Sequence, residues 1–132
     1  ASEFVFPYDD NQFDLIFLTS VFTHMFKDDV ANYLTQISRV LKPGGKSLIT
    51  WFLLNGVSRT AEEPFFDFAY NFDDVTKTTT PKNPEAALAF DEDFVRGLHS
   101  KCGLAIAGVE HGTWAQKDSP YQLQDMVIAT KV

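Results

Sequence analysis

Two apolar runs joined by one amphipathic helix constrain the fold of this chain more than any other feature of its sequence. The first run, residues 13–19, reads Phe-Asp-Leu-Ile-Phe-Leu-Thr, and the second run covers residues 46–54. Nearly continuous apolar runs of this length are typical of strands that are covered on both faces, as in a central parallel sheet. Because a helix connects the two strands, the segment predicts a right-handed βαβ crossover.

The connecting helix is expected to begin at Asp28 and Asp29, whose carboxylates suit the positive N-terminal end of a helix. Its apolar side chains recur at helical spacing and form one face: Val30, Tyr33, Leu34, Ile37, Val40 and Leu41. The run Lys-Pro-Gly-Gly at residues 42–45 predicts the end of the helix and a tight turn. Residues 20–25, before the helix, are expected to form a turn and one helical turn.

The second half of the chain predicts one more helix and two more strands. Asp91 is expected to cap a helix that ends at Gly103. Strands are expected over residues 104–109 and 124–131. No linker divides the chain, so residues 1–132 are interpreted as a single domain.

Residues 55–90 differ from the rest because they contain prolines and a threonine run and are too long for a plain loop. We expect a flap or insertion within the domain, more mobile than the crossover strands. Its aromatic residues alternate with smaller or polar ones and predict a short extended segment with one aromatic face: Phe66, Phe68, Tyr70 and Phe72.

The charge and composition of the chain limit the classes of function that it can have. The chain has 18 acidic and 11 basic residues and a formal net charge of −7. A sequence-independent nucleic-acid binder or a binder of anionic membranes needs the opposite balance. No apolar run approaches the roughly 20 residues that cross a bilayer. Cys102 is the one cysteine, so a reducing compartment, the cytoplasm, is expected. The 13 Phe require a tightly packed aromatic core or an apolar face that a partner covers.

Two stretches of the sequence resemble a known family. FPYDDNQFDLIFLTSVFTHM (residues 6–25) and YLTQISRVLKPGGKSLITWFLL (residues 33–54) are similar to the second half of a class I S-adenosylmethionine (SAM)-dependent methyltransferase, of the methyltransferase type 11-like kind. The resemblance implies an α/β fold, a partial Rossmann-like sheet of about four strands with helices on its faces. In the family's order these strands lie first, second, fourth, third, and the last strand is antiparallel.

The chain also departs from this family. The glycine-rich loop that cradles the methionine end of the cofactor is missing, since no Gly-x-Gly occurs. The acidic residue that holds the ribose hydroxyls would also lie upstream. The resemblance therefore implies the C-terminal part of a methyltransferase. We expect this part alone to be inactive and to bind SAM too weakly to measure.

The same resemblance implies site residues. Thr19, Ser20 and Val21 would line the methionine portion of the cofactor or the methyl-transfer pocket, although they could equally form a helix start with Ser20 as its cap. Phe4 would flank the adenine ring, or simply begin an apolar strand. His24 is a weak candidate for a catalytic base, and packing is the alternative.

Other polar and aromatic residues are interpreted more simply. His99 and His111 have no further ligands at metal-binding spacing, so no metal site is expected. Trp114 is interpreted as core, with a role beside the acceptor as the alternative. Gln124 and Asp125 are interpreted as turn and edge residues.

Two functions from different classes remain open at this point. The first is methyl transfer from SAM to an unknown small-molecule or protein acceptor. The second is a non-catalytic α/β module that assembles through the exposed edge of strand 13–19, most simply as a homodimer. Phe13, Ile16 and Phe17 are the residues expected to be exposed there.

Overall fold

The computed structural model describes residues 1–61, 64, 66–116 and 123–132, which form two four-stranded sheets with helices. The first sheet has the spatial order β1 (Phe13–Leu18), β2 (Leu41–Trp51), β8 (Asp125–Lys131) and β7 (Leu104–Glu110). The second has the order β3 (Leu53–Leu54), β6 (Leu88–Asp91), β5 (Thr76–Thr78) and β4 (Tyr70–Asn71). The helices are α1 (Lys27–Val40), α2 (Gly56–Thr60) and α3 (Glu92–Lys101), with 3-10 turns at Phe22–His24 and Pro84–Ala86.

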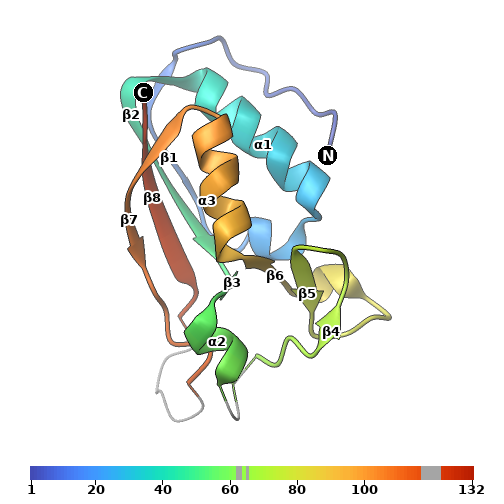
Figure 1. Cartoon of the computed structure of the whole chain (residues 1–132). Coiled ribbons are helices and arrows are strands. Elements are labelled where there is room, and N and C mark those ends of the chain that lie inside the picture. The colour runs from blue at the N-terminus through green and yellow to red at the C-terminus, as the bar shows by residue number, and fades with distance from the viewer. Residues whose placement is uncertain (62–63, 65, 117–122) are drawn as a thin grey trace.

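The βαβ crossover predicted from the sequence is confirmed. β1 and β2 are parallel neighbours, and α1 connects them (Figure 1). β8 runs antiparallel between β2 and β7. In chain order the strands of this sheet therefore lie first, second, fourth, third, as the family's order implies.

α1 buries the apolar face that its spacing predicts, at Val30, Leu34, Ile37 and Val40. The turn expected at residues 42–45 has a different form. Phe13 pairs with Leu41 and Leu15 pairs with Lys46. Residues 42–45 of β2 therefore form a bulge opposite a single residue of β1, Asp14. The helix ends at Val40, and the chain enters the sheet directly.

The ends of α3 are as predicted. The Asp91 side chain caps the helix, because its Oδ1 accepts hydrogen bonds from the backbone N–H groups of Asp93 at 2.8 Å and Phe94 at 3.3 Å. Gly103 follows the helix with φ of +73°. Glycine adopts this left-handed conformation without the Cβ penalty that other residues meet, so it ends the helix.

Both long helices pack against the same face of the first sheet (Figure 1), and their buried side chains join one core with those of β2 and β8. The coverage of β1 on both faces expected from its sequence is therefore wrong. Leu15 is 58% and Phe17 64% exposed, whereas Phe13 and Ile16 pack against the core. Phe13, Ile16 and Phe17 were all expected to be exposed. Phe17 is exposed, whereas Phe13 and Ile16 are partly buried against the core.

The described part of residues 55–90 contains α2, the second 3-10 turn, β4, β5 and most of β6. That this segment is a flap or insertion stays a prediction. The expected single aromatic face is wrong. Phe68 is buried and Phe66 packs beside it against Phe52, while Tyr70 and Phe72 are exposed. A two-residue β4 is too short to keep alternate side chains on one face. The higher mobility of this segment stays a prediction.

His99 gives this fold a testable dependence on pH. Its imidazole is buried on α3 near Trp51, and burial lowers its pKa. Below about pH 6.5, His99 takes up a proton in the unfolded chain, whereas burial disfavours its protonated form in the folded chain. The free energy of unfolding therefore falls as the pH falls. We expect His99→Leu to remove up to about 1.4 kcal/mol per pH unit of this dependence.

Urea unfolding at several pH values between about 5 and 8 measures this slope. Ser100→Ala, which changes an exposed residue of the same helix that does not titrate, is the control and should keep the wild-type slope. If His99→Leu unfolds with an unchanged slope, His99 is not the group that titrates.

Candidate functional site

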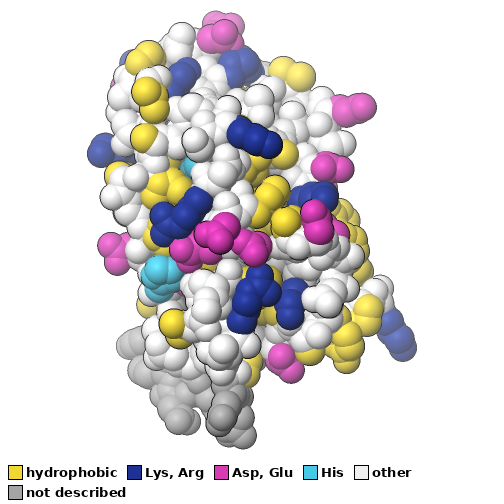
Figure 2. Space-filling view, in the orientation of Figure 1, with side chains coloured by type: hydrophobic (Ala, Val, Ile, Leu, Met, Phe, Trp, Pro, Cys, Tyr) yellow, Lys and Arg dark blue, Asp and Glu magenta, His cyan; other side chains and the backbone are white. Residues whose placement is uncertain are grey.

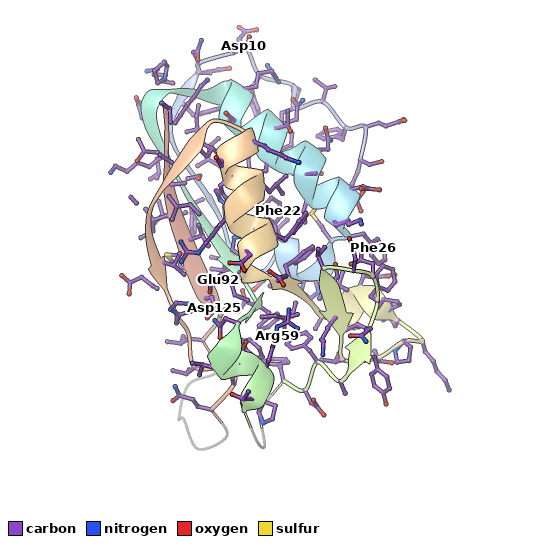
Figure 3. The ribbon with its side chains drawn as sticks, in the orientation of Figure 1. Asp10, Phe22, Phe26, Arg59, Glu92 and Asp125 are labelled. Atoms are coloured by element: carbon purple, nitrogen blue, oxygen red, sulfur yellow. The ribbon has the colours of Figure 1, made fainter. Side chains whose placement is uncertain are left out.

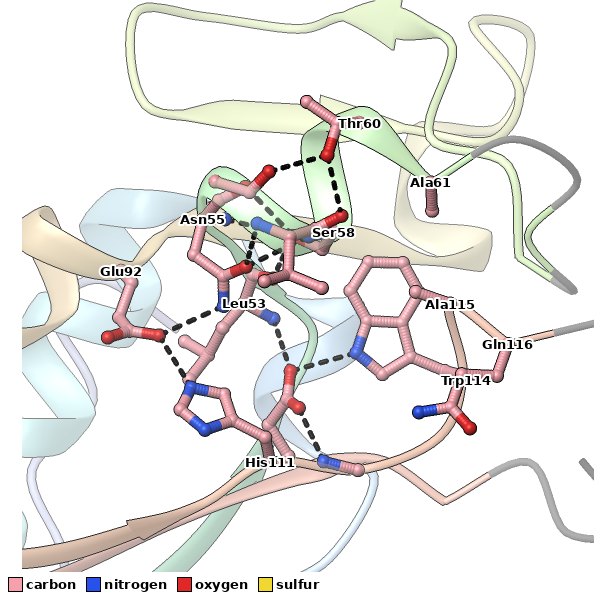
Figure 4. A pocket seen from close by; sticks show the side chains of 14 residues that line it. Leu53, Asn55, Ser58, Thr60, Ala61, Glu92, His111, Trp114, Ala115 and Gln116 are labelled. Carbon is pink, nitrogen blue, oxygen red and sulfur yellow. Dashed lines mark hydrogen bonds and ion pairs between the residues drawn. The ribbon is translucent and has the colours of Figure 1, made fainter.

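Two cavities adjoin at the end of the molecule where β2 passes into β3. The larger, here named the α2 pocket, has a volume of about 930 Å³ and lies between α2, the start of α3 and residues 111–116 (Figure 4). The smaller, here named the β1 cavity, has a volume of about 600 Å³ and is lined by Ser20 and Thr50. His111 and Gly112 line both.

Asp125 is the buried centre of the α2 pocket. Its Oδ2 accepts hydrogen bonds from the Leu53 backbone N–H and from Trp114 Nε1, each at 2.8 Å. Its Oδ1 accepts one from the Gly112 backbone N–H at 2.7 Å. The residue is 3% exposed. Burial raises its pKa although these three hydrogen bonds lower it, so the carboxylate is held by fixed donors rather than by water.

Gly112 must be glycine for this arrangement to form. A Cβ built on it would overlap the carbonyl oxygen of Leu123 and lie 2.5 Å from that of Gln124. No side chain tolerates such contacts with backbone atoms. The absence of a side chain therefore lets the segment before β8 close over the carboxylate.

A histidine and a carboxylate form the polar wall of the same pocket. Glu92 Oε1 accepts hydrogen bonds from His111 Nε2 at 3.0 Å and from Asn55 Nδ2 at 3.2 Å, and Arg96 binds Oε2 (Figure 4). Burial raises the pKa of Glu92, but the hydrogen bonds from these three side chains outweigh it and lower the pKa. Glu92 is therefore ionised near neutral pH and orients the His111 ring.

The predicted cofactor residues 19–21 follow β1. Thr19 and Ser20 are exposed and Val21 packs against the core. Ser20 has φ of +57° and donates its backbone N–H to Thr50 Oγ1 at 2.9 Å. The alternative of Ser20 as a helix cap is wrong, because Val21 precedes the 3-10 turn and no side chain caps it.

Phe4 and His24 lie outside both cavities. Phe4 is 50% exposed and packs beside Tyr33, which also contacts Phe22, so it is linked to the segment after β1 through one ring. His24 is exposed, and its Nδ1 lies 2.9 Å from the carbonyl oxygen of Glu85. The structure does not bring His24 together with His111 or Glu92 in either cavity.

Sequence reasoning missed the buried carboxylate of the site. Asp125 was expected at a turn or edge, but it is buried at the start of β8. An acidic residue that opens an apolar strand is a possible signal of burial, yet its partners are distant in the sequence. Trp114 is core, as expected, and also lines the α2 pocket. A role beside the acceptor stays a prediction.

The described residues hold no group of three or more His, Cys, Asp or Glu placed to bind a metal ion. None of their helices combines the length and apolar character that a membrane crossing requires.

Charges of both signs lie side by side at the start of α3. Arg96 pairs with Glu92 at 3.0 Å and Arg59 pairs with Asp91 at 3.0 Å. On the face drawn in Figure 2, basic and acidic side chains accordingly adjoin across the middle of the molecule. Figure 3 places Glu92, Arg59 and Asp125 near α2, at the end of the molecule opposite Asp10.

Comparison with known proteins agrees with this architecture. Residues 2–49 match the family model described as a methyltransferase domain. A SAM-dependent methyltransferase from Methanosarcina mazei is 21% identical, with a TM-score of 0.65, over 99% of this chain and 64% of that chain. The 1,6-didemethyltoxoflavin-N1-methyltransferase of Burkholderia thailandensis is 18% identical, with a TM-score of 0.61, over 99% of this chain and 48% of that chain.

These likenesses show the fold, which is that of a class I methyltransferase-like domain with a Rossmann-like sheet. A SAM-dependent methyltransferase from Aquifex aeolicus is a third example, 20% identical with a TM-score of 0.55 over 97% of this chain and 50% of that chain. The chain thus spans between about half and two thirds of the length of these solved structures.

Asp125→Asn tests the buried carboxylate. An amide has one acceptor oxygen, so its NH₂ group would face at least one of the N–H donors that now point at Asp125. We expect the free energy of unfolding to fall by about 1–3 kcal/mol, the cost of a buried donor left unpaired.

Urea unfolding measures this loss. Asp67→Asn, at an exposed position, is the matched control and should change stability by no more than about 0.5 kcal/mol. Equal stability of the two variants would contradict the role given to Asp125.

Proposed function

We propose that residues 1–132 are the C-terminal part of a SAM-dependent methyltransferase that transfers a methyl group to a small-molecule or protein acceptor. The observation that carries the proposal is the sheet order β1-β2-β8-β7, in which residues 19–21 leave the end of β1 beside an open cavity. In open α/β sheets, ligands bind beyond the carboxyl ends of the parallel strands. The family match over residues 2–49 includes this strand end.

The residues of this chain fit one side of SAM. Thr19 and Ser20 offer exposed polar groups beside the β1 cavity, and Ser20 is fixed there because its side-chain oxygen accepts from Gln124 Nε2 at 3.0 Å. Phe4 offers an exposed ring to the adenine. The glycine loop that would hold the methionine end is not among these residues, so this chain supplies one wall of the site.

Bound SAM supplies a methyl group on a sulfonium, which an acceptor displaces in line. Such a displacement depends chiefly on the alignment of the two reactants. In this proposal, residues 19–21 contribute by positioning rather than by reacting. The complete reaction needs the remaining part of the cofactor site.

Calorimetric titration of SAM tests the proposal. We expect no measurable binding by residues 1–132 and micromolar binding when the N-terminal half of the fold is restored. In the restored protein, Ser20→Val should weaken binding at least about tenfold, because a β-branched residue is strained at positive φ.

Ser100→Val changes an exposed serine on α3, away from both cavities, and should bind as the unmodified protein does. No binding by the restored protein would contradict methyl transfer. Micromolar binding by residues 1–132 alone would contradict the proposal that they hold only part of the cofactor site.

A non-catalytic assembly module is the second candidate, and the exposed edge of the first sheet favours it. β1 pairs on one side only within the described residues. Phe17 is in register with Leu48 and Leu48 with Ile128, so an apolar row crosses the face opposite the helices. An exposed apolar edge strand is a template for pairing with another chain.

Sedimentation over a concentration series tests this candidate. The isolated chain should form a two-fold dimer through β1 or the adjoining face, and Phe17→Lys should shift it to the monomer. Tyr70→Lys, at a half-exposed aromatic residue of β4, is the control and should leave the dimer intact. A wild-type chain that is monomeric at the highest concentration would reject the module.

A further inference from the structure

We infer that the α2 pocket binds an uncharged aromatic acceptor with one ionisable O–H or N–H group, and that His111 accepts the proton this group loses. The inference rests on the proposed methyl transfer. Its first support is position: His111 lines both the α2 pocket and the β1 cavity. The imidazole therefore lies at the border between the proposed cofactor side and the larger pocket.

The hydrogen bonds of the pocket leave His111 and the Gln116 side chain available, and of these two only His111 can accept a proton near neutral pH. Both oxygens of Asp125 are taken by backbone and indole N–H donors. Both oxygens of Glu92 are taken as well, and Arg96 offsets its charge. His111 uses Nε2 to bind Glu92, and within the described part of the chain its Nδ1 has no hydrogen-bond partner. The His111 side chain is 52% exposed, so the ring is open to solvent.

The bond to Glu92 also decides which proton His111 carries. An ionised carboxylate accepts a hydrogen bond, so Nε2 holds the proton and Nδ1 presents a lone pair. After Nδ1 takes a second proton, the adjacent carboxylate stabilises the imidazolium. Glu92 is a positioning residue in this scheme, and His111 is the group that touches the acceptor.

The remaining walls indicate the class of acceptor. Among the lining residues, Val57 provides exposed apolar surface. The Trp114 ring lies at the inner side of the pocket, 3% exposed, with its N–H directed at Asp125 (Figure 4). An aromatic molecule gains from burial against such side chains. The two carboxylates are already paired, so the pocket offers an ionic partner to neither an anion nor a cation.

The group transfer balances with His111 as the proton acceptor. A lone pair of the acceptor oxygen or nitrogen attacks the methyl carbon, a new bond forms to that carbon, and the carbon–sulfur bond breaks. The electron pair of the broken bond stays on sulfur, which becomes a neutral thioether. The O–H or N–H proton passes to His111 Nδ1 and then to water.

The test uses the 132-residue chain, without SAM, and two probes. 7-Hydroxycoumarin carries an ionisable hydroxyl, whereas 7-methoxycoumarin has the same rings without it. The chain contains two tryptophans, so its ¹H–¹⁵N spectrum holds two indole signals. We expect both probes to shift the Trp114 signal and not that of Trp51, which lines neither cavity. The hydroxyl probe should bind roughly tenfold more tightly, the gain of about one hydrogen bond.

His111→Gln should bind 7-methoxycoumarin as the wild type does but lose the tenfold preference. Absorbance should show more coumarin phenolate with the wild type than with this variant. His24→Gln, the other exposed histidine, should keep both signals, and an unmoved Trp51 signal reports that each variant is folded. The proposal is overturned if Trp114 does not respond, if the wild type prefers neither probe, or if His111→Gln keeps the preference.

The proposed function fails separately from this inference. Loss of SAM binding in the restored protein would reject methyl transfer and leave the probe results as those of a ligand pocket. Negative probe results alongside SAM binding would reject the pocket and the role of His111 alone.

Discussion

One buried carboxylate holds together the region on which the site depends. Asp125 opens β8 in the first sheet and accepts from the backbone of Leu53, the first residue of the second sheet. It also fixes Gly112 and Trp114, which come from the segment before β8. Without this centre, three N–H groups would be buried without acceptors, a cost that a small domain cannot absorb easily. The α2 pocket follows from these constraints.

Within the described residues, helices cover only one face of the first sheet. α1 and α3 share one core with β2 and β8. The opposite face carries Leu15 and Phe17 in an exposed position. Exposed apolar side chains that adjoin one another are typical of surfaces that contact another part of a fold or another chain. In the proposed methyltransferase, the remaining part of the fold would cover this face. In the alternative assembly module, a second copy of the chain would cover it.

Local patterns in the sequence predicted the parts of the fold that depend on neighbours in the chain. The periodicity of α1, the Asp91 cap and the apolar runs of β1 and β2 all belong to this class. Burial of Asp125 depends on partners up to 72 residues away. The split of Phe66 and Phe68 from Tyr70 and Phe72 depends on which rings reach the second core. Long-range packing overrides local alternation in such cases, so sequence reasoning missed them.

The most direct test of the central claim is a crystal structure of the restored protein with bound S-adenosylhomocysteine. The account predicts that the sulfur of this ligand lies beside residues 19–21, in the β1 cavity. The side of the sulfur that carries the methyl group in SAM should face His111 and the α2 pocket. A ligand that lies away from the end of β1, or one whose sulfur faces away from His111, would contradict the account.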